Sequence, residues 1–253
     1  MIGIANLVFL SILSVFLIFV PVSLAHAQEA VMSARGIVKS MGESALSTDL
    51  IAPVLNITKR EGEAFQKGDI LIQFDCRRFN AELASAEAEY EAAYAVAQNN
   101  RNLKRYGAVG GTDLTISDAK ARKARADADV LIVKVSQCII FAPFNGRVVE
   151  KMVNEFEIPT ALSPLLKIVD DTRLEIDLII SSRLLNNLQI DGTFSFLVDE
   201  TGKTYQAKLT RIGAVVDPIS QTVRVSGAFI KSQPQSVKPG MSGRAEFEIT
   251  TKQ

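Results

Sequence analysis

The spacing of apolar positions divides the 253-residue chain into a central helical part and two β-rich flanks. Between Cys76 and Cys138, apolar or small residues recur at alternating intervals of three and four, which is typical of a heptad helix packed on a partner helix. The first series is Phe79, Leu83, Ala86, Tyr90, Ala93 and Ala97, and the second is Leu114, Ser117, Ala121, Ala124, Ala128, Leu131, Val135 and Cys138. Because the Gly-rich segment 107–111 separates the two series, we predict an antiparallel helical hairpin.

Short strand-like segments with glycine-containing turns lie on both sides of this hairpin. Segments 51–54 and 70–75 precede it. After it, segment 142–149 repeats the Ala-Pro of the first, and segment 164–170 resembles the second. Neither half-motif can bury an apolar face alone, so we expect the two halves to pack on each other and carry the hairpin.

The C-terminal third of the chain alternates between apolar and polar residues, as half-solvated antiparallel strands do. The expected strands are 173–178, 193–198, 205–212, 222–230 and 244–249, with a short helix at 181–188 and a further strand at 33–40. Such a set fits a closed β-barrel, because closure removes exposed strand edges.

The N-terminal residues indicate export from the cytoplasm. Residues 7–20 are free of charge, Pro21 follows them, and Ala25 and Ala27 provide the small side chains that a signal peptidase reads. We predict a signal peptide that is cleaved between Ala27 and Gln28. The alternative is an uncleaved N-terminal anchor, although the apolar run is shorter than the ~20 residues of a comfortable membrane span.

The two cysteines are therefore interpreted for an oxidising compartment, where an even pair usually forms a disulfide. Cys76 opens the first predicted helix and Cys138 closes the second, so an antiparallel hairpin brings them together at its base. We predict a disulfide, and two small buried residues are the alternative. The single histidine, His26, is lost with the signal peptide, which argues against a zinc site or a histidine-based triad.

Charge and short motifs argue against several function classes. The 28 basic and 28 acidic residues cancel, which leaves no overall field to attract nucleic acid. The acidic pair at 170–171 has the turn-like context of solvated acids, and Gly110-Gly111 lacks the Lys-Ser/Thr of a phosphate loop. We predict no enzymatic activity, with no catalytic residue, no metal site and no cofactor.

The order of motifs resembles a known family. Ala-Pro-Val at 52–54, Lys-Gly-Asp-Ile-Leu at 67–71, the hairpin, Ala-Pro-Phe-Asn-Gly-Arg-Val-Val at 142–149 and Pro-Leu-Leu-Lys-Ile-Val-Asp at 164–170 are similar to the periplasmic adaptors, or membrane fusion proteins, of the hemolysin-D-like superfamily. The resemblance covers nearly the whole mature chain. It implies a mainly β protein with an α-helical hairpin: a lipoyl-like barrel-sandwich hybrid split by the hairpin, then a small antiparallel β-barrel.

The resemblance also implies a division into domains. The expected ranges are a signal peptide at 1–27, an N-terminal strand joining the β-barrel at 28–48, the first half of the lipoyl-like domain at 49–75, the hairpin at 76–138, the second half at 139–171 and the β-barrel at 172–253. We expect no further domain after the barrel. The family usually has glycine at the positions of Phe156 and Leu162, so we expect those turns to be rebuilt around larger side chains.

The function that the resemblance implies is that of an adaptor in a tripartite efflux or secretion system. Such a subunit lies in the periplasm at the inner membrane, links an inner-membrane transporter to an outer-membrane channel and assembles into a ring. The resemblance favours a transporter of the RND type and leaves the ABC type open. The alternatives are a lipoyl-like carrier, which would need a modifiable lysine between the halves, and a periplasmic solute- or metal-binding protein.

The hairpin tip is the expected partner-binding site. At ~1.5 Å per residue, about 30 helical residues project the tip ~45 Å from the β-body. The family commonly uses an Arg there, an apolar residue four positions later and a Ser seven beyond that. Here Arg105 and Val109 match, Ile116 takes the third place and Ser117 comes one late. The expected contact residues are Arg105, Val109, Gly110, Leu114 and Ser117.

Overall fold

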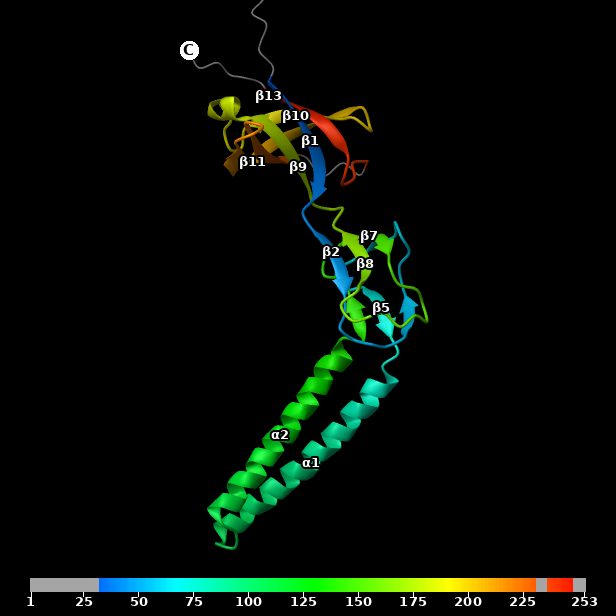
Figure 1. Cartoon of the computed structure of the whole chain (residues 1–253), viewed down its shortest axis with the longest axis vertical. Coiled ribbons are helices and arrows are strands. Elements are labelled where there is room, and N and C mark those ends of the chain that lie inside the picture. Colours follow the sequence, from blue (N-terminus) through cyan, green and yellow to red (C-terminus); the bar gives the residue numbers. More distant parts are fainter. Residues whose placement is uncertain (1–31, 231–235, 248–253) are drawn as a thin grey trace, which may run out of the picture.

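The computed structural model describes residues 32–230 and 236–247, which form three bodies in a row (Figure 1). A β-barrel lies at one end, a pair of small sheets lies in the middle, and a long helical hairpin extends to the other end. The predicted cleavage site between Ala27 and Gln28 lies outside the described residues. Within those residues, no helix has the length and apolar character needed to cross a membrane.

Six antiparallel strands close the barrel. Around the barrel their order is β1 (Met32–Ser40), β13 (Ser242–Phe247), β10 (Thr193–Val198), β11 (Lys203–Asp217), β12 (Thr222–Phe229) and β9 (Leu174–Ser181), which pairs with β1 again. Side chains on β1 alternate between buried and exposed, as expected for a sheet with one face on the core. Phe196, Ile176 and Leu178 are fully buried inside. The predicted short helix is a 3-10 turn, η1 (Ser182–Asn187).

Two small sheets form the middle body. One has the order β2 (Glu43–Ser47), β8 (Pro164–Val169), β7 (Gly146–Lys151) and β4 (Ala64–Phe65), and the other has β3 (Val54–Ile57), β5 (Ile70–Phe74) and β6 (Ile139–Phe141). Each sheet joins strands from before and after the hairpin, since β4 pairs with β7 and β5 pairs with β6. Leu71, Leu165 and Ile168 are completely buried in their shared core. The predicted fold class, a split lipoyl-like domain with a hairpin and a barrel, is confirmed.

Of the range 28–48, which we expected to join the barrel, the described residues divide between two bodies. Residues 32–40 pair in the barrel, whereas β2 pairs with β8 in the middle body. The change of partner occurs at the joint, where Asp170 N donates to Gly42 O (2.7 Å) and Met41 N donates to Arg173 O (2.9 Å). These bonds turn both chain segments away from the barrel, so the prediction for 43–47 is wrong.

Asp170, which we expected to be solvated, is buried, and its carboxylate organises this joint. It accepts hydrogen bonds from Thr172 N (2.9 Å) and Arg173 Nε (2.6 Å). Burial alone raises the pKa of Asp170, but the hydrogen bonds from Thr172 and Arg173 outweigh it and hold that pKa below its usual value. Next to it, Asp171 pairs with Arg147 of β7 and, at 3.5 Å, with Lys238 of the segment before β13. Charged groups therefore connect the barrel to the middle body.

Two bulky residues occupy backbone positions that normally favour glycine. Phe156 has a φ of 66° and Leu162 a φ of 63°. Their amides donate to Val54 O (2.7 Å) and Thr48 O (2.8 Å), so the turns keep the geometry that glycine would adopt. The expectation that these turns are rebuilt is therefore wrong. Both side chains point into solvent, at 80% and 73% exposed, and contribute little packing.

Two adjacent chain segments connect the hairpin to the middle body. The helices are α1 (Arg77–Arg105) and α2 (Gly111–Ser136). A disulfide links Cys76, just before α1, to Cys138, just after α2, with 6.0 Å between the Cα atoms. Phe74 N also donates to Cys138 O (2.9 Å), which continues the pairing of β5 and β6 up to the disulfide.

Replacing Phe156 or Leu162 with glycine is expected to stabilise the protein. Each change removes a left-handed conformation that costs an L-residue ~1–2 kcal/mol, and part of this gain is offset by the greater freedom of glycine in the unfolded chain. The net gain in the free energy of unfolding is about 0.5–1 kcal/mol each, measured by urea denaturation. The matched control is Ile158→Gly, an exposed apolar residue of the same loop without a positive φ, which should lose stability. Equal losses in all three variants would contradict the prediction.

The disulfide is expected to stabilise the hairpin base. Its sequence separation is 62 residues, and closing such a loop contributes ~4 kcal/mol in the chain-entropy account. The variant with both Cys76→Ala and Cys138→Ala should lose about that much in urea denaturation, and the reduced wild type should behave like it. Non-reducing digestion and mass mapping of the mature protein should yield the linked peptides. Two free thiols there would refute the pairing.

Candidate functional site: the helical hairpin

The two helices pack along the series of positions that the sequence predicts. On α1, Phe79 and Ala97 are buried, and the four other members of the series are partly buried. On α2, Ser117, Ala121, Ala124 and Ala128 are buried. Small side chains at these buried positions let the two helices approach each other closely. The predicted hairpin and its inner seam are confirmed by this burial pattern.

The turn between the helices is short and defined by local signals. Gly107 adopts a φ of 71°, and Gly110 has an extended backbone that starts α2. Lys104 and Arg105 lie in the last turn of α1 and Asp113 in the first turn of α2, where each sign of charge complements the helix dipole. The tip is thus a compact turn closed by the ends of both helices.

The structure distributes the expected contact residues over two environments. Arg105 and Gly110 are exposed at the tip, and Val109 and Leu114 are partly buried. Ser117 is only 4% exposed, and its hydroxyl donates to Leu114 O at 2.9 Å. Because Ser117 lies in the inner seam against α1, its side chain is not part of the tip surface.

Two exposed apolar residues of the tip are absent from the contact residues that the sequence predicts. Tyr106 follows directly after α1 and is 86% exposed, and Ile116 is about half exposed on α2. The signal for Ile116 was its place seven positions after Val109, where the family motif has a polar residue. The tip surface is therefore formed by Arg105, Tyr106, Val109, Gly110 and Ile116, which we call the tip patch.

Positive charge gathers near the tip patch. Arg101 pairs with Asp118 across the two helices, with 2.8 Å between Nη2 and Oδ1, and so links the helices near the tip. Lys104, Arg105, Lys120 and Arg122 have no acidic partner among the described residues. A partner that contacts the tip therefore meets several unpaired cations beside exposed apolar side chains.

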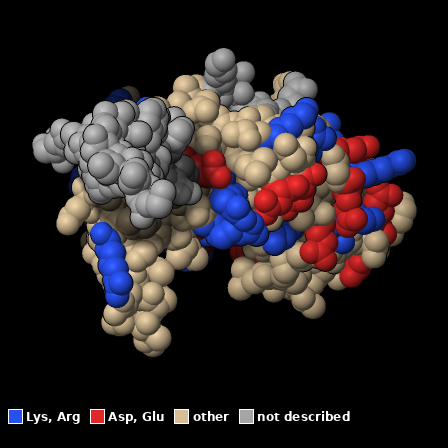
Figure 2. All heavy atoms as spheres, turned by 90° about the horizontal axis from the view of Figure 1, so that it is seen from above, with Lys and Arg blue, Asp and Glu red and all other residues tan. Residues whose placement is uncertain are grey.

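Charges elsewhere are mixed. On the face seen in Figure 2, Lys and Arg lie beside Asp and Glu without a large patch of one sign. Many charged residues away from the tip are paired, such as Arg35 with Asp199 and Lys167 with Glu43. Among the residues that the structure describes, no group of three His, Cys, Asp or Glu is placed to hold a metal ion.

Sequence comparison finds curated relatives at low identity, and no family model matches the chain. The nodulation protein NolF of Rhizobium meliloti is 23% identical over 197 residues, which cover 72% of this chain and 54% of that protein. The multidrug resistance protein MdtN of Escherichia coli K12 is 25% identical over 164 residues, which cover 64% of this chain and 45% of that protein. The chain thus spans about half the length of the curated relatives it matches.

Solved structures show the same architecture. A chimera of MacA that carries the α-hairpin domain of Pseudomonas aeruginosa MexA matches with a TM-score of 0.76 at 18% identity, covering 87% of this chain and 81% of that one. The membrane fusion protein Spr0693 of Streptococcus pneumoniae R6 matches with a TM-score of 0.71 at 18% identity, and the match covers 87% of this chain and 99% of that one. The chain therefore has the fold of the membrane fusion proteins, and its predicted resemblance to the periplasmic adaptors is confirmed.

Proposed function

We propose that this chain is the adaptor subunit of a tripartite efflux or secretion system and bridges an inner-membrane transporter and an outer-membrane channel. The observation that carries the proposal is the hairpin itself. The 29 residues of α1 project the tip roughly 44 Å from the sheets, at ~1.5 Å per residue. Of the helical residues, only Phe79 and Val135 at the base pack in the core of the sheets, so the use of the remaining protrusion lies in contact with another molecule.

The two ends of the molecule offer separate surfaces for two partners. The tip patch lies at one end, and the barrel lies at the other end, beyond the middle body (Figure 1). On the barrel, the connection between β11 and β12 presents Ile219, which is almost fully exposed. In this proposal the tip patch contacts the outer-membrane channel and the barrel contacts the transporter.

A second apolar series on each helix supports a ring of copies. On α1, Ala81, Ala88, Ala92 and Ala95 are exposed, and on α2, Ile116, Ala119, Ala126, Val130 and Val133 are exposed. Each of these residues follows an inner-seam position by two, which places it ~200° around the helix, on the outer side of the hairpin. Two different apolar faces on opposite sides of one unit suit a head-to-tail contact, and such contacts close into rings.

The finer features of the proposal follow from the sequence and its relatives. We place the body of the protein in the periplasm after signal cleavage, held at the inner membrane by its partners, and we assign it no enzymatic activity. The names of NolF and MdtN connect those relatives with nodulation and multidrug resistance. For this chain we propose export through a transporter of the RND type.

Photo-crosslinking in living cells tests the bridging role. A photoreactive amino acid at Arg105 or Tyr106 is expected to capture an outer-membrane protein, and one at Ile219 to capture an inner-membrane transporter. The control position is Val96, which is exposed on the side of α1 away from both ends. If neither end captures an envelope protein, the bridging role is wrong.

Introducing charge on the outer face tests the ring. The variant Val130→Asp/Val133→Asp is expected to reduce self-association at least tenfold, because it places two carboxylates in an apolar contact. The control is Val96→Asp, because Val96 lies in neither apolar series and the change has the same helix-propensity cost per substitution. Sedimentation velocity and native mass spectrometry measure the assembly. Identical association of both variants would exclude the outer face as the contact.

A further inference from the structure

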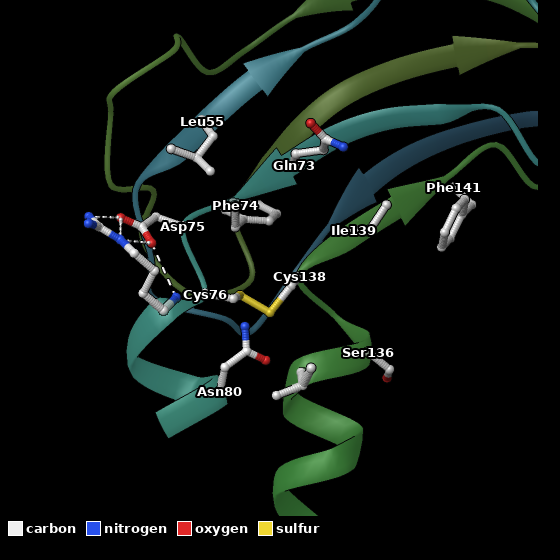
Figure 3. A pocket seen from close by; sticks show the side chains of 12 residues that line it. Leu55, Gln73, Phe74, Asp75, Cys76, Asn80, Ser136, Cys138, Ile139 and Phe141 are labelled. Carbon is white, nitrogen blue, oxygen red and sulfur yellow. Dashed lines mark hydrogen bonds and ion pairs between the residues drawn. A yellow bond between two sulfur atoms is a disulfide. The ribbon is translucent and has the colours of Figure 1, made fainter. Parts of the chain in front are cut away.

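An apolar pocket lies in the angle between the hairpin base and the outer face of the three-stranded sheet (Figure 3). Its volume is about 680 Å³, within the range of pockets that hold drug-sized molecules. Leu55 of β3, Gln73 of β5, and Ile139 and Phe141 of β6 line the sheet side. Asn80, Val135 and Ser136 line the helix side, and the disulfide lies between the two sides.

The walls of this pocket are held in place before any ligand arrives. The sheet side is fixed by the pairing of β3 and β6 with β5. The helix side is fixed by the Cys76–Cys138 disulfide. A preformed site loses little conformational freedom on binding, which favours affinity for a small molecule.

Two side-chain amides in the pocket are left without hydrogen-bond partners among the described residues. Gln73 lies in the central strand, and the amide of Asn80 points toward the disulfide from the first turn of α1 (Figure 3). Each amide provides two donors and one acceptor. Ser136 donates its hydroxyl hydrogen to Val133 O (2.6 Å) and keeps its oxygen free as an acceptor. Apart from Asp75 and Arg77 at the rim, these polar side chains of the pocket are uncharged and include both hydrogen-bond donors and acceptors.

The charged groups at the rim cancel each other. Arg77 Nε donates to Asp75 Oδ1 (2.9 Å) and Arg77 Nη2 donates to Asp75 Oδ2 (2.6 Å). The hydrogen bond from Arg77 lowers the pKa of Asp75 to about 2, so this pair stays ionised and neutral overall at ordinary pH. A charged ligand would lose hydration against apolar walls without meeting an opposite free charge, which is unfavourable.

We propose that this pocket binds an uncharged, drug-sized molecule with an apolar body and a hydrogen-bonding N–H, amide or hydroxyl on one edge. The apolar body covers Leu55, Ile139 and Phe141, which the folded chain leaves partly or half exposed. The polar edge bonds to the free amides of Gln73 and Asn80. This binding activity goes beyond the bridging function and does not depend on it, because the pocket lies within one chain.

A pair of matched fluorescent probes tests the proposal on the mature protein. N-phenyl-1-naphthylamine is neutral, largely apolar and carries one N–H, and 8-anilinonaphthalene-1-sulfonate adds a negative charge to the same rings. The neutral probe is expected to bind saturably at one molecule per chain, and the charged probe at least tenfold more weakly. The protein has no tryptophan, so the probes are read without its emission. Non-saturating binding, or equal binding of both probes, would overturn the proposal.

Variants locate the bound probe. Leu55→Ser/Phe141→Ser removes two half-exposed apolar side chains from the pocket wall and is expected to raise the Kd of the neutral probe at least tenfold. Gln73→Leu removes a hydrogen bond and is expected to raise that Kd about fivefold. Ile158→Ser and Val215→Ser are controls, because both are exposed apolar residues that do not line the pocket. Circular dichroism verifies that each variant folds.

A second copy of the chain is the competing occupant of the same apolar surface. Sedimentation velocity of the wild type and of Leu55→Ser/Phe141→Ser separates the two cases. If the double variant abolishes self-association while the neutral probe fails to bind the wild-type monomer, the pocket is a subunit contact and the proposal is wrong. Saturable binding to the monomer, lost in the double variant and retained in the controls, supports it.

Discussion

The pairing of β5 with β6 is the interaction on which the rest of the molecule depends. It joins strands from opposite sides of the hairpin, matching Ile70 with Phe141 and Gln73 with Ile139. Because these strands lead directly into α1 and out of α2, their pairing sets the distance between the helix ends and brings Cys76 within reach of Cys138. A long two-helix insertion is tolerated because its ends are already adjacent, so it adds little loop-closure cost.

The hairpin then acts as a rigid extension of this small sheet pair. Its inner seam of mostly small residues holds α1 and α2 together, and Arg101 pairs with Asp118 near the far end. At the opposite side, the buried Asp170 fixes the joint to the barrel through bonds from Thr172 and Arg173. Rigid arms on both sides of one central body suit a subunit that holds two partners at a set distance.

Much of this architecture follows from the sequence, for identifiable reasons. Heptad spacing reports burial directly, so the inner seam is readable residue by residue from Phe79 to Cys138. Alternation identifies a strand but not its partner, so the pairing of β2 with β8 in the four-stranded sheet could not be derived. The heptad spacing also indicates that Ser117 faces α1, whereas the family motif led us to expect Ser117 at the tip surface. The place of Tyr106 in the tip patch has no periodic signal, because Tyr106 lies just after the last residue of α1.

The positive φ of Phe156 and Leu162 was equally beyond pattern reasoning, since bulky residues seldom adopt it. A protein that keeps strained, exposed apolar residues gives up stability without any gain in its own core. The exposed apolar residues on the outer faces of α1 and α2 and the half-exposed Phe141 likewise add no packing to the core of the protein. All these exposed apolar groups lie on the hairpin or on the middle body that carries it. These groups, like Ile219 on the barrel, leave apolar surface in water, and contacts with other molecules would repay that cost.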